Sequence, residues 1–248
     1  MRRTALLNLV LVLALLAAAC TPAADEGAEA PASDIAPQPS QTATTDDQAD
    51  EEGPTADADA SGGGGGTLVV AISQDPGNLN PAITTSGGTH TASEILYNGL
   101  VRYDEDLELV PDLAESWEIE GDGTTWTFTL RDDVLWHDGE PFTSEDVKFT
   151  FEEMLLPFQS RMAASLTGVL ESIDTPDEQT VVFNFSEPYG PLLQQLHVSD
   201  APILAAHVYE GVENVEEAEQ NLNPVGTGPF QFVSYTPDSE VRLERNPN

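Results

Sequence analysis

The sequence predicts a mixed fold of the α/β or α+β class for residues 67–248 of the 248-residue chain. Three patterns predict it: a continuous apolar run, alternating segments around a glycine-rich turn, and a capped stretch with apolar residues at helical spacing. Strands and helices are mixed along the chain without a regular βαβ repeat. A hydrophobic content of 40% is enough for a real core in one or two domains.

The first expected elements are a strand and a helix. Residues 67–72 form a nearly continuous apolar run rich in β-branched residues, which is typical of a central strand buried on both faces. Prolines and glycines within 73–88 predict an irregular loop. A helix is expected from about Thr89 to Asn98, with Gly99 in the C′ position just past its end. The side chains that this helix should bury are Ala92, Ile95 and Leu96.

A β-hairpin and an amphipathic helix are expected next. Residues 116–120 and 125–130 alternate polar with apolar side chains around Gly121-Asp122-Gly123, which predicts the hairpin. Thr143 stands three residues before Asp146, a variant of the capping box that starts a helix. The apolar residues that follow at helical spacing are Val147, Phe151, Met154 and Leu155.

The last third of the chain predicts shorter elements. A strand is expected at 181–185 after a turn at 175–178, and short helices are expected near 192–196 and 203–209. Residues 228–233 and 240–244 indicate a closing pair of strands. Gly226-Thr227-Gly228 lacks the ending of a phosphate loop and is interpreted as a turn into the strand. Residues 136–139, Trp-His-Asp-Gly, are interpreted as a turn beside a buried tryptophan.

The charge balance excludes a nucleic-acid-binding protein. Forty-four Asp and Glu against eight Lys and Arg give a formal net charge of −36, and residues 67–248 carry −27 of it. Binding to phosphates needs clustered basic residues, because the release of counterions supplies most of that affinity. The carboxylate pairs are too numerous to indicate a general acid and base, and they are interpreted as a solvated surface.

Few side chains in the sequence indicate catalysis, a metal or a cofactor. The single cysteine, Cys20, excludes an intrachain disulfide framework and a Cys-rich metal site. No two of the four histidines have the spacing that would place two ligands on one helical face, so neither a metal site nor a cofactor is predicted. No serine lies in a G-x-S-x-G elbow, so a secreted hydrolase is kept only as an alternative.

The N-terminal 66 residues predict export and tethering. Arg2-Arg3 precede an apolar run from Leu6 to Ala19 that is too short to span a bilayer and ends in small residues before Cys20. Residues 1–20 resemble a bacterial lipoprotein signal, with Cys20 as the lipidated residue; a general secretory signal is the alternative. Residues 21–66 are rich in Ala, Pro, Gly and acidic residues, which predicts a disordered, flexible tether.

Five segments together resemble the family 5 extracellular solute-binding proteins, which bind oligopeptides, dipeptides or nickel for ABC importers. Each segment alone is a weak signal, but the five follow the order of the family over nearly all of 67–248. The segments are Leu109 to Trp117, Trp126 to Arg131, His137 to Val147, Asn223 to Phe230, and Leu243 to Pro247.

The resemblance implies an α/β, periplasmic-binding-protein-like, two-lobed clamp of the class II type. Family members are considerably longer, so this chain is expected to be an N-terminal fragment with only the first lobe and its subdomain present. By similarity, 67–97 and 187–248 are assigned to the first lobe and 98–186 to the subdomain. The ligand of such a clamp lies in the cleft between the lobes.

The resemblance also implies the function and the partners. The chain is expected to be a non-enzymatic, monomeric component of an ABC import system that captures peptides or similar small polar solutes and delivers them to the transmembrane subunits of the permease. Its expected location is outside the cytoplasm, in the periplasmic space or on the outer surface, held by the lipid anchor. A receptor for chelated nickel or another non-peptide solute is the alternative.

Two segments are predicted to contact the ligand. In the family, the loop before the first helix reaches the ligand, and its glycines would let backbone groups approach closely. Arg161 could meet a ligand carboxylate with two parallel hydrogen bonds, or form a surface ion pair. The loop residues predicted at the site are Thr84, Thr85, Ser86, Gly87, Gly88 and His90, and those after the capped helix are Phe158, Arg161 and Met162.

Overall fold

The computed structural model describes residues 66–247, which form four short helices and eight strands joined by 3-10 turns. The helices are α1 (Gly87–Ser93), α2 (Ser144–Phe149), α3 (Leu156–Phe158) and α4 (Ser160–Leu166), with the π-helical segment η4 (Thr150–Leu155) joining α2 to α3. The strands are β1 (Val101–Tyr103), β2 (Leu109–Pro111), β3 (Ala114–Glu120), β4 (Thr125–Leu130), β5 (Leu170–Asp177), β6 (Thr180–Phe185), β7 (Phe230–Thr236) and β8 (Glu240–Arg245). The predicted signal, Cys20 and the predicted tether up to residue 65 lie outside the described residues.

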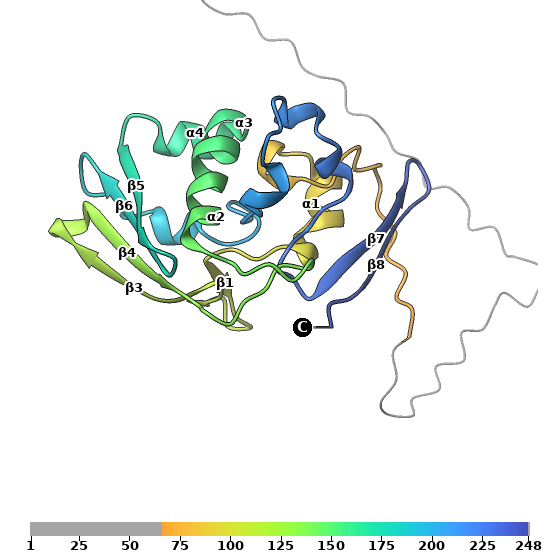
Figure 1. Cartoon of the computed structure of the whole chain (residues 1–248), viewed down its shortest axis with the longest axis horizontal. Helices are drawn as coiled ribbons and strands as arrows, with labels where there is room; N and C mark the ends of the chain where they lie inside the picture. Colours follow the sequence, from red (N-terminus) through yellow and green to blue (C-terminus); the bar gives the residue numbers. More distant parts are fainter. Residues whose placement is uncertain (1–65, 248) are drawn as a thin grey trace, which may run out of the picture. The chain divides into compact units, whose positions relative to one another are not determined.

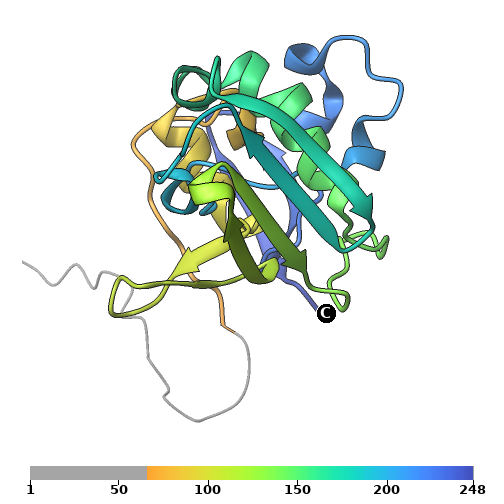
Figure 2. The ribbon, with the colours of Figure 1, turned by 90° about the vertical axis from the view of Figure 1, so that its left-hand side faces the viewer.

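An antiparallel sheet of order β3-β4-β6-β5 is the largest element of the described chain. Helix α2 and η4 lie over one face of this sheet, as Figures 1 and 2 show. The core between them is aromatic: the ring of Phe183 is 5.0 Å from that of Phe151 and 5.7 Å from that of Phe128, both nearly edge-to-face. All three side chains are fully buried. The predicted hairpin, the predicted strand at 181–185 and the apolar face of the helix are therefore confirmed.

Strand β5 was not predicted, because Thr175 and Pro176 indicated a turn. The strand continues through Pro176 to Asp177, and the actual turn joins Asp177 to Thr180. Proline is tolerated here because β5 is the edge strand of the sheet, where a missing N–H can face away from the neighbouring strand.

The predicted central strand at 67–72 is wrong. Residues 66–72 form no regular element, and they pair with no strand in the described part of the chain. The side chains of Leu68 and Val69 are 86% and 85% exposed. A β-branched run becomes a buried strand only where a neighbouring strand and an apolar surface cover it. Residues 66–247 supply neither for this run.

The predicted helix at 89–98 is shifted and shorter. Helix α1 begins at Gly87 and ends at Ser93, and a 3-10 turn, η2 (Glu94–Leu96), follows it. Leu96 is buried as predicted, but Ile95 is 45% exposed. Gly99 does not adopt a left-handed cap conformation. It is required instead by close packing, because a Cβ there would lie 2.4 Å from the carbonyl oxygen of Leu196.

The remaining predictions are mostly confirmed. The closing strand pair is β7 and β8, and Thr143 and Asp146 form the predicted capping box of α2. Trp136 is fully buried beside the predicted turn, and Asp146 accepts hydrogen bonds from its Nε1 and from the Ala206 N–H. The two late helices are 3-10 turns only, at Leu192–Gln195 and Ala206–Tyr209.

Candidate functional site

The predicted ligand loop at 84–90 is a loop only as far as Ser86, because α1 begins at Gly87 and includes Gly88 and His90. Hydrogen bonds within this segment hold its loop part against the start of α1. The Nε2 of His90 is 2.9 Å from the carbonyl oxygen of Thr84, and the Ser86 N–H donates to the Thr84 hydroxyl at 3.1 Å. Thr85 and Gly87 are exposed, and nothing lies within 4 Å of a Cβ placed on Gly87. Thr85 in the loop and Gly87, the first residue of α1, are thus the open part of this segment.

Gly88 serves the packing of the loop. It is buried, and a Cβ at this position would lie 3.2 Å from the carbonyl oxygen of Gln74 and 3.3 Å from that of Asp75. The start of α1 therefore rests directly on the backbone of residues 74–76, and the Thr89 hydroxyl donates to the Pro76 carbonyl at 2.9 Å. This contact fixes the direction in which the chain enters α1 from the loop.

His90 and Glu94 form an ion pair one helical turn apart. The Nδ1 of His90 is 3.1 Å from the Oε1 of Glu94. This hydrogen bond is the main cause that raises the pKa of His90 and lowers the pKa of Glu94, and burial opposes both shifts. The contribution of His90 to stability is full below its ordinary pKa of about 6.5 and is lost as the pH rises through the raised value. The pair is therefore strongest in mildly acidic solution.

Gln159 caps the start of α4 and connects this helix to another part of the chain. Its Oε1 accepts from the Met162 N–H at 2.9 Å, which caps the helix, and its Nε2 donates to the Asp200 carbonyl at 2.8 Å. The side chain is almost completely buried; its bond to the Met162 N–H is buried, and its bond to the Asp200 carbonyl is partly buried. Gln159 thereby holds the first turn of α4 against the segment that carries Asp200.

The three predicted residues of this segment have different surroundings. Arg161 lies on the exposed side of α4, and its Nη1 is 2.5 Å from the Oδ1 of Asp200. Phe158 is half-buried at the end of α3. Met162 is only 3% exposed and belongs to the hydrophobic core, so in the described structure its side chain packs against the interior.

The turn at residues 197–201 completes the site. The Nε2 of His197 is 3.3 Å from the Oδ2 of Asp200, and the N–H groups of Asp200 and Ala201 both donate to the His197 carbonyl. The ring of His197 also lies 5.3 Å from that of Tyr103 on β1. These contacts hold the turn, and with it the Asp200 carboxylate, in one place.

The resulting group of side chains is called the charged cluster and consists of His90, Glu94, Arg161, His197 and Asp200. Electrostatic effects connect its members: Arg161 opposes protonation of His90, and His197 favours the ionised form of Glu94. With neutral histidines the cluster carries one positive and two negative charges. Such a surface can bind ligands through charge and hydrogen bonds, and it contains no evident nucleophile.

The structure therefore brings together His90, Thr84 and Arg161 from two separate predicted segments. Sequence reasoning missed Glu94, Gln159, His197 and Asp200, because no spacing along the chain indicates that they meet. Among residues 66–247, no group of three or more His, Cys, Asp or Glu side chains could hold a metal ion.

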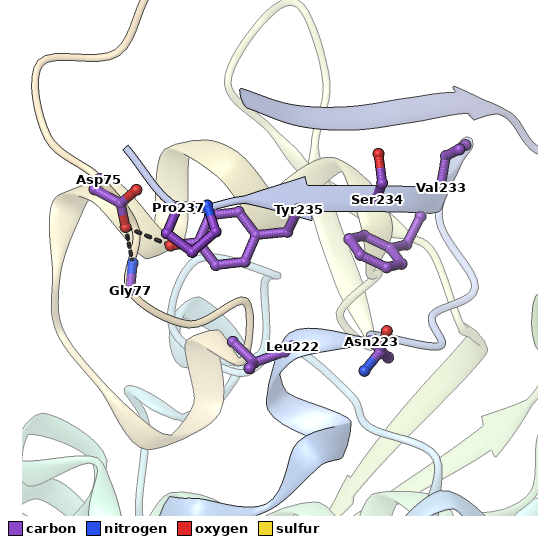
Figure 3. A pocket seen from close by; sticks show the side chains of 9 residues that line it. Asp75, Gly77, Leu222, Asn223, Val233, Ser234, Tyr235 and Pro237 are labelled. Atoms are coloured by element: carbon purple, nitrogen blue, oxygen red, sulfur yellow. Dashed lines mark hydrogen bonds between the residues drawn. The ribbon is translucent and has the colours of Figure 1, made fainter. Parts of the chain in front are cut away.

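An open groove of about 610 Å³ lies beside β7, and none of the residues predicted to bind the ligand lines it. Figure 3 shows Asp75 on one side of it, accepting hydrogen bonds from the Gly77 N–H and the Tyr235 hydroxyl. The Asp238 N–H also donates to this carboxylate. The bond from Tyr235 is the main cause that lowers the pKa of Asp75. The Asp75 carboxylate thus accepts three hydrogen bonds from the protein itself.

The architecture is that of a periplasmic solute-binding protein, present in part. It resembles DppA of Helicobacter pylori, a periplasmic binding protein solved with the peptide STSA, with a TM-score of 0.58 and 28% identity over 68% of this chain and 37% of that one. It also resembles NikZ of Campylobacter jejuni, solved with Ni(L-His), with a TM-score of 0.56 and 32% identity over 68% of this chain and 33% of that one. The predicted fold class is confirmed.

The chain belongs to the bacterial extracellular solute-binding proteins, family 5. Residues 108–248 match the model of a family described as "Bacterial extracellular solute-binding proteins, family 5 Middle". The chain is also 35% identical over 198 residues to the dipeptide-binding protein of Escherichia coli K12. The aligned region covers 72% of this chain and 37% of that protein. It spans between 36% and 38% of the length of the curated relatives that it matches.

Extracellular solute binding is thus the general role of the family. In the part of the chain that the structure describes, no helix has the length and apolar character needed to cross a membrane. The division into a first lobe (67–97 and 187–248) and a subdomain (98–186) stays a prediction.

Proposed function

We propose that this protein captures peptides or similar small solutes outside the membrane for an ABC importer, without changing them chemically. The observation that carries this proposal is the charged cluster in a chain of this family. It presents an exposed guanidinium, two carboxylates and two imidazoles, whose side chains come from three separate segments. Such groups can recognise the charged ends of a peptide by hydrogen bonding.

The named ligands of the two similar structures support this ligand class. One is the peptide STSA and the other is a nickel complex of L-His, and both contain a carboxyl group. Arg161 is the cluster side chain best suited to a carboxylate, because a guanidinium offers parallel donors at matching spacing. The transmembrane subunits of the permease are the proposed protein partner, by membership of the family.

Isothermal titration calorimetry of the purified protein with the dipeptides Ala-Phe and Ala-Ala and the tripeptide Ala-Ala-Ala tests this proposal. We expect heat from saturable binding, and we expect chromatography to recover the peptide intact after prolonged incubation. Absence of binding to every peptide would remove the peptide-receptor proposal. Cleavage of a bound peptide would instead favour the hydrolase alternative.

A receptor for chelated nickel is the second candidate, and the similarity to NikZ with Ni(L-His) favours it. His90 and His197 could contact the chelator rather than the metal, since the described residues hold no metal-binding group of their own. Titration with the nickel complex of L-His, compared with free L-His and with nickel chloride, separates this candidate from the peptide receptor. Selective binding of the complex would identify the nickel role.

We further propose that Cys20 carries a lipid that anchors the protein, and that residues 21–66 act as a spacer between membrane and binding domain. The support is the arrangement of Arg2-Arg3, an apolar run and small residues before Cys20. Labelling of cells with a radioactive fatty acid should mark the wild-type protein. Equal labelling of a Cys20→Ser variant would disprove the anchor.

A further inference from the structure

The ion pair between Arg161 and Asp200 joins two residues of unequal accessibility. The Arg161 side chain is 59% exposed, whereas that of Asp200 is 24% exposed. Among the described residues, the guanidinium of Arg161 donates a hydrogen bond only from its Nη1, to Asp200. A ligand that approaches from solvent therefore meets the guanidinium first, with most of its donors available.

Asp200 is held in place from several directions. Its carbonyl accepts from the buried Gln159 side chain at 2.8 Å, and its N–H donates to the His197 carbonyl at 3.0 Å. Its second carboxylate oxygen lies 3.3 Å from the Nε2 of His197. Arg161, in contrast, is a long and exposed side chain that can turn away at little cost. Of the two partners, Arg161 is the one able to move.

We propose that Asp200 sets the ligand preference of this site by competing with the ligand for Arg161. In the ligand-free protein Asp200 holds the guanidinium, and a ligand carboxylate takes its place when it binds. This inference rests on the proposed function, and it assigns a selectivity role to a residue that itself need not touch the ligand. The ligand class that it predicts is a small solute with a free carboxylate.

Two features favour a carboxylate over a cationic ligand group. A carboxylate that takes Arg161 leaves the Oδ2 of Asp200 3.3 Å from the Nε2 of His197, so the released carboxylate keeps a polar neighbour. A ligand amine would have to reach Asp200 past Arg161, and the like charges of amine and guanidinium would repel. The competition also predicts which ligands are rejected, because a ligand without a negative group cannot replace Asp200 on the guanidinium.

The first experiment compares Ala-Phe with Ala-Phe amide, which lacks the carboxylate, by calorimetry. The variants are Asp200→Asn and Arg161→Gln. Asp133→Asn serves as the matched control, because Asp133 pairs with Arg131 in another exposed ion pair at 2.9 Å. Asparagine keeps the size of Asp200 and leaves the backbone bonds of the turn in place, and circular dichroism confirms folding.

We expect Asp200→Asn to increase the affinity for Ala-Phe by about three- to fivefold, since an ion pair of this exposure is worth up to about that factor. The affinity for the amide should stay unchanged. Arg161→Gln should weaken the binding of Ala-Phe about tenfold and abolish the difference between acid and amide. If Asp200→Asn leaves the ratio of the two affinities at its wild-type value, or lowers the affinity for Ala-Phe, the competition is disproved.

A second experiment separates this inference from the proposed function. In protein labelled with ¹⁵N-arginine, the Arg161 Nε signal is assigned with an Arg161→Lys variant and followed during titration with sodium acetate. We expect acetate to shift this signal at lower concentration in Asp200→Asn than in the wild type. Equal titration curves would overturn the inference even if peptides bind. Failure of every peptide to bind, with the acetate difference present, would reject only the peptide-receptor proposal.

Discussion

Replacement of Gly226 by alanine tests the packing that holds η2, the turn that carries Glu94 of the charged cluster. A Cβ at position 226 would lie 1.7 Å from the carbonyl oxygen of Leu96 and 2.7 Å from its carbonyl carbon. Ordinary contact begins near 3.4 Å, so the two backbones would have to separate by about 1.7 Å. The same carbonyl accepts the Gly228 N–H at 2.9 Å, and this bond would be lost.

The expected loss of stability is about 2–4 kcal/mol, from about 1–3 kcal/mol of overpacking and about 1 kcal/mol for the hydrogen bond. The assay is urea unfolding followed by tryptophan fluorescence. Gly190→Ala is the matched control, because Gly190 has nothing within 4 Å of its Cβ position and no positive φ. We expect the control to change the free energy of unfolding by less than about 0.5 kcal/mol. A Gly226→Ala variant as stable as this control would refute the reasoning.

Three further predictions concern the core, the pH dependence and the connection between segments. Phe183→Ala should cost roughly 3–5 kcal/mol in urea unfolding, whereas Ile119→Ala, at a side chain 52% exposed, should cost less than about 0.5 kcal/mol. Burial lowers the pKa of His137, whose ring bonds to the Gly226 N–H and the Gly228 carbonyl. The contribution of His137 to the stability of the fold is therefore full above a pH of about 6.5 and falls as the pH decreases through the lowered pKa. The melting temperature should decrease more between pH 7.5 and pH 5.5 in the wild type than in His137→Asn. Equal decreases in the two proteins would contradict the role of His137 in this pH dependence. Gln159→Ala should cost about 1–3 kcal/mol, since it removes one buried and one partly buried hydrogen bond, and an unchanged urea midpoint would show that they are not stabilising.

Local signals in the sequence predicted the elements whose hydrogen bonds and turns involve residues close together in the chain. The hairpin of β3 and β4 follows from alternation around a glycine turn, and the start of α2 follows from the pair Thr143 and Asp146. Each of these signals depends on residues a few positions apart, so no knowledge of the rest of the chain is needed.

Elements that depend on distant partners were not predictable in the same way. The run at 67–72 has the composition of a buried strand, yet its side chains are exposed because nothing in residues 66–247 covers them. Strand β5 forms despite Pro176 because it lies at the edge of a sheet, and the sequence does not state which strand is the edge.

For the candidate site, the sequence supplied Arg161 and the loop around His90, but not their neighbours. Asp200 and His197 look like any other turn residues in so acidic a chain. Their turn meets α4 through the hydrogen bond from Gln159 to the Asp200 carbonyl and through the ion pair of Arg161 with Asp200, and neither contact follows from spacing along the chain.

The sequence by itself determined the family, the strongly acidic character and the local elements, because these follow from composition and from short-range spacing. The tertiary structure alone decided which charges meet. Contacts between residues as far apart in the sequence as His90, Arg161 and Asp200 arise from the packing of whole segments. The energy of that packing comes from side chains throughout the core, so no short stretch of sequence around the site indicates it.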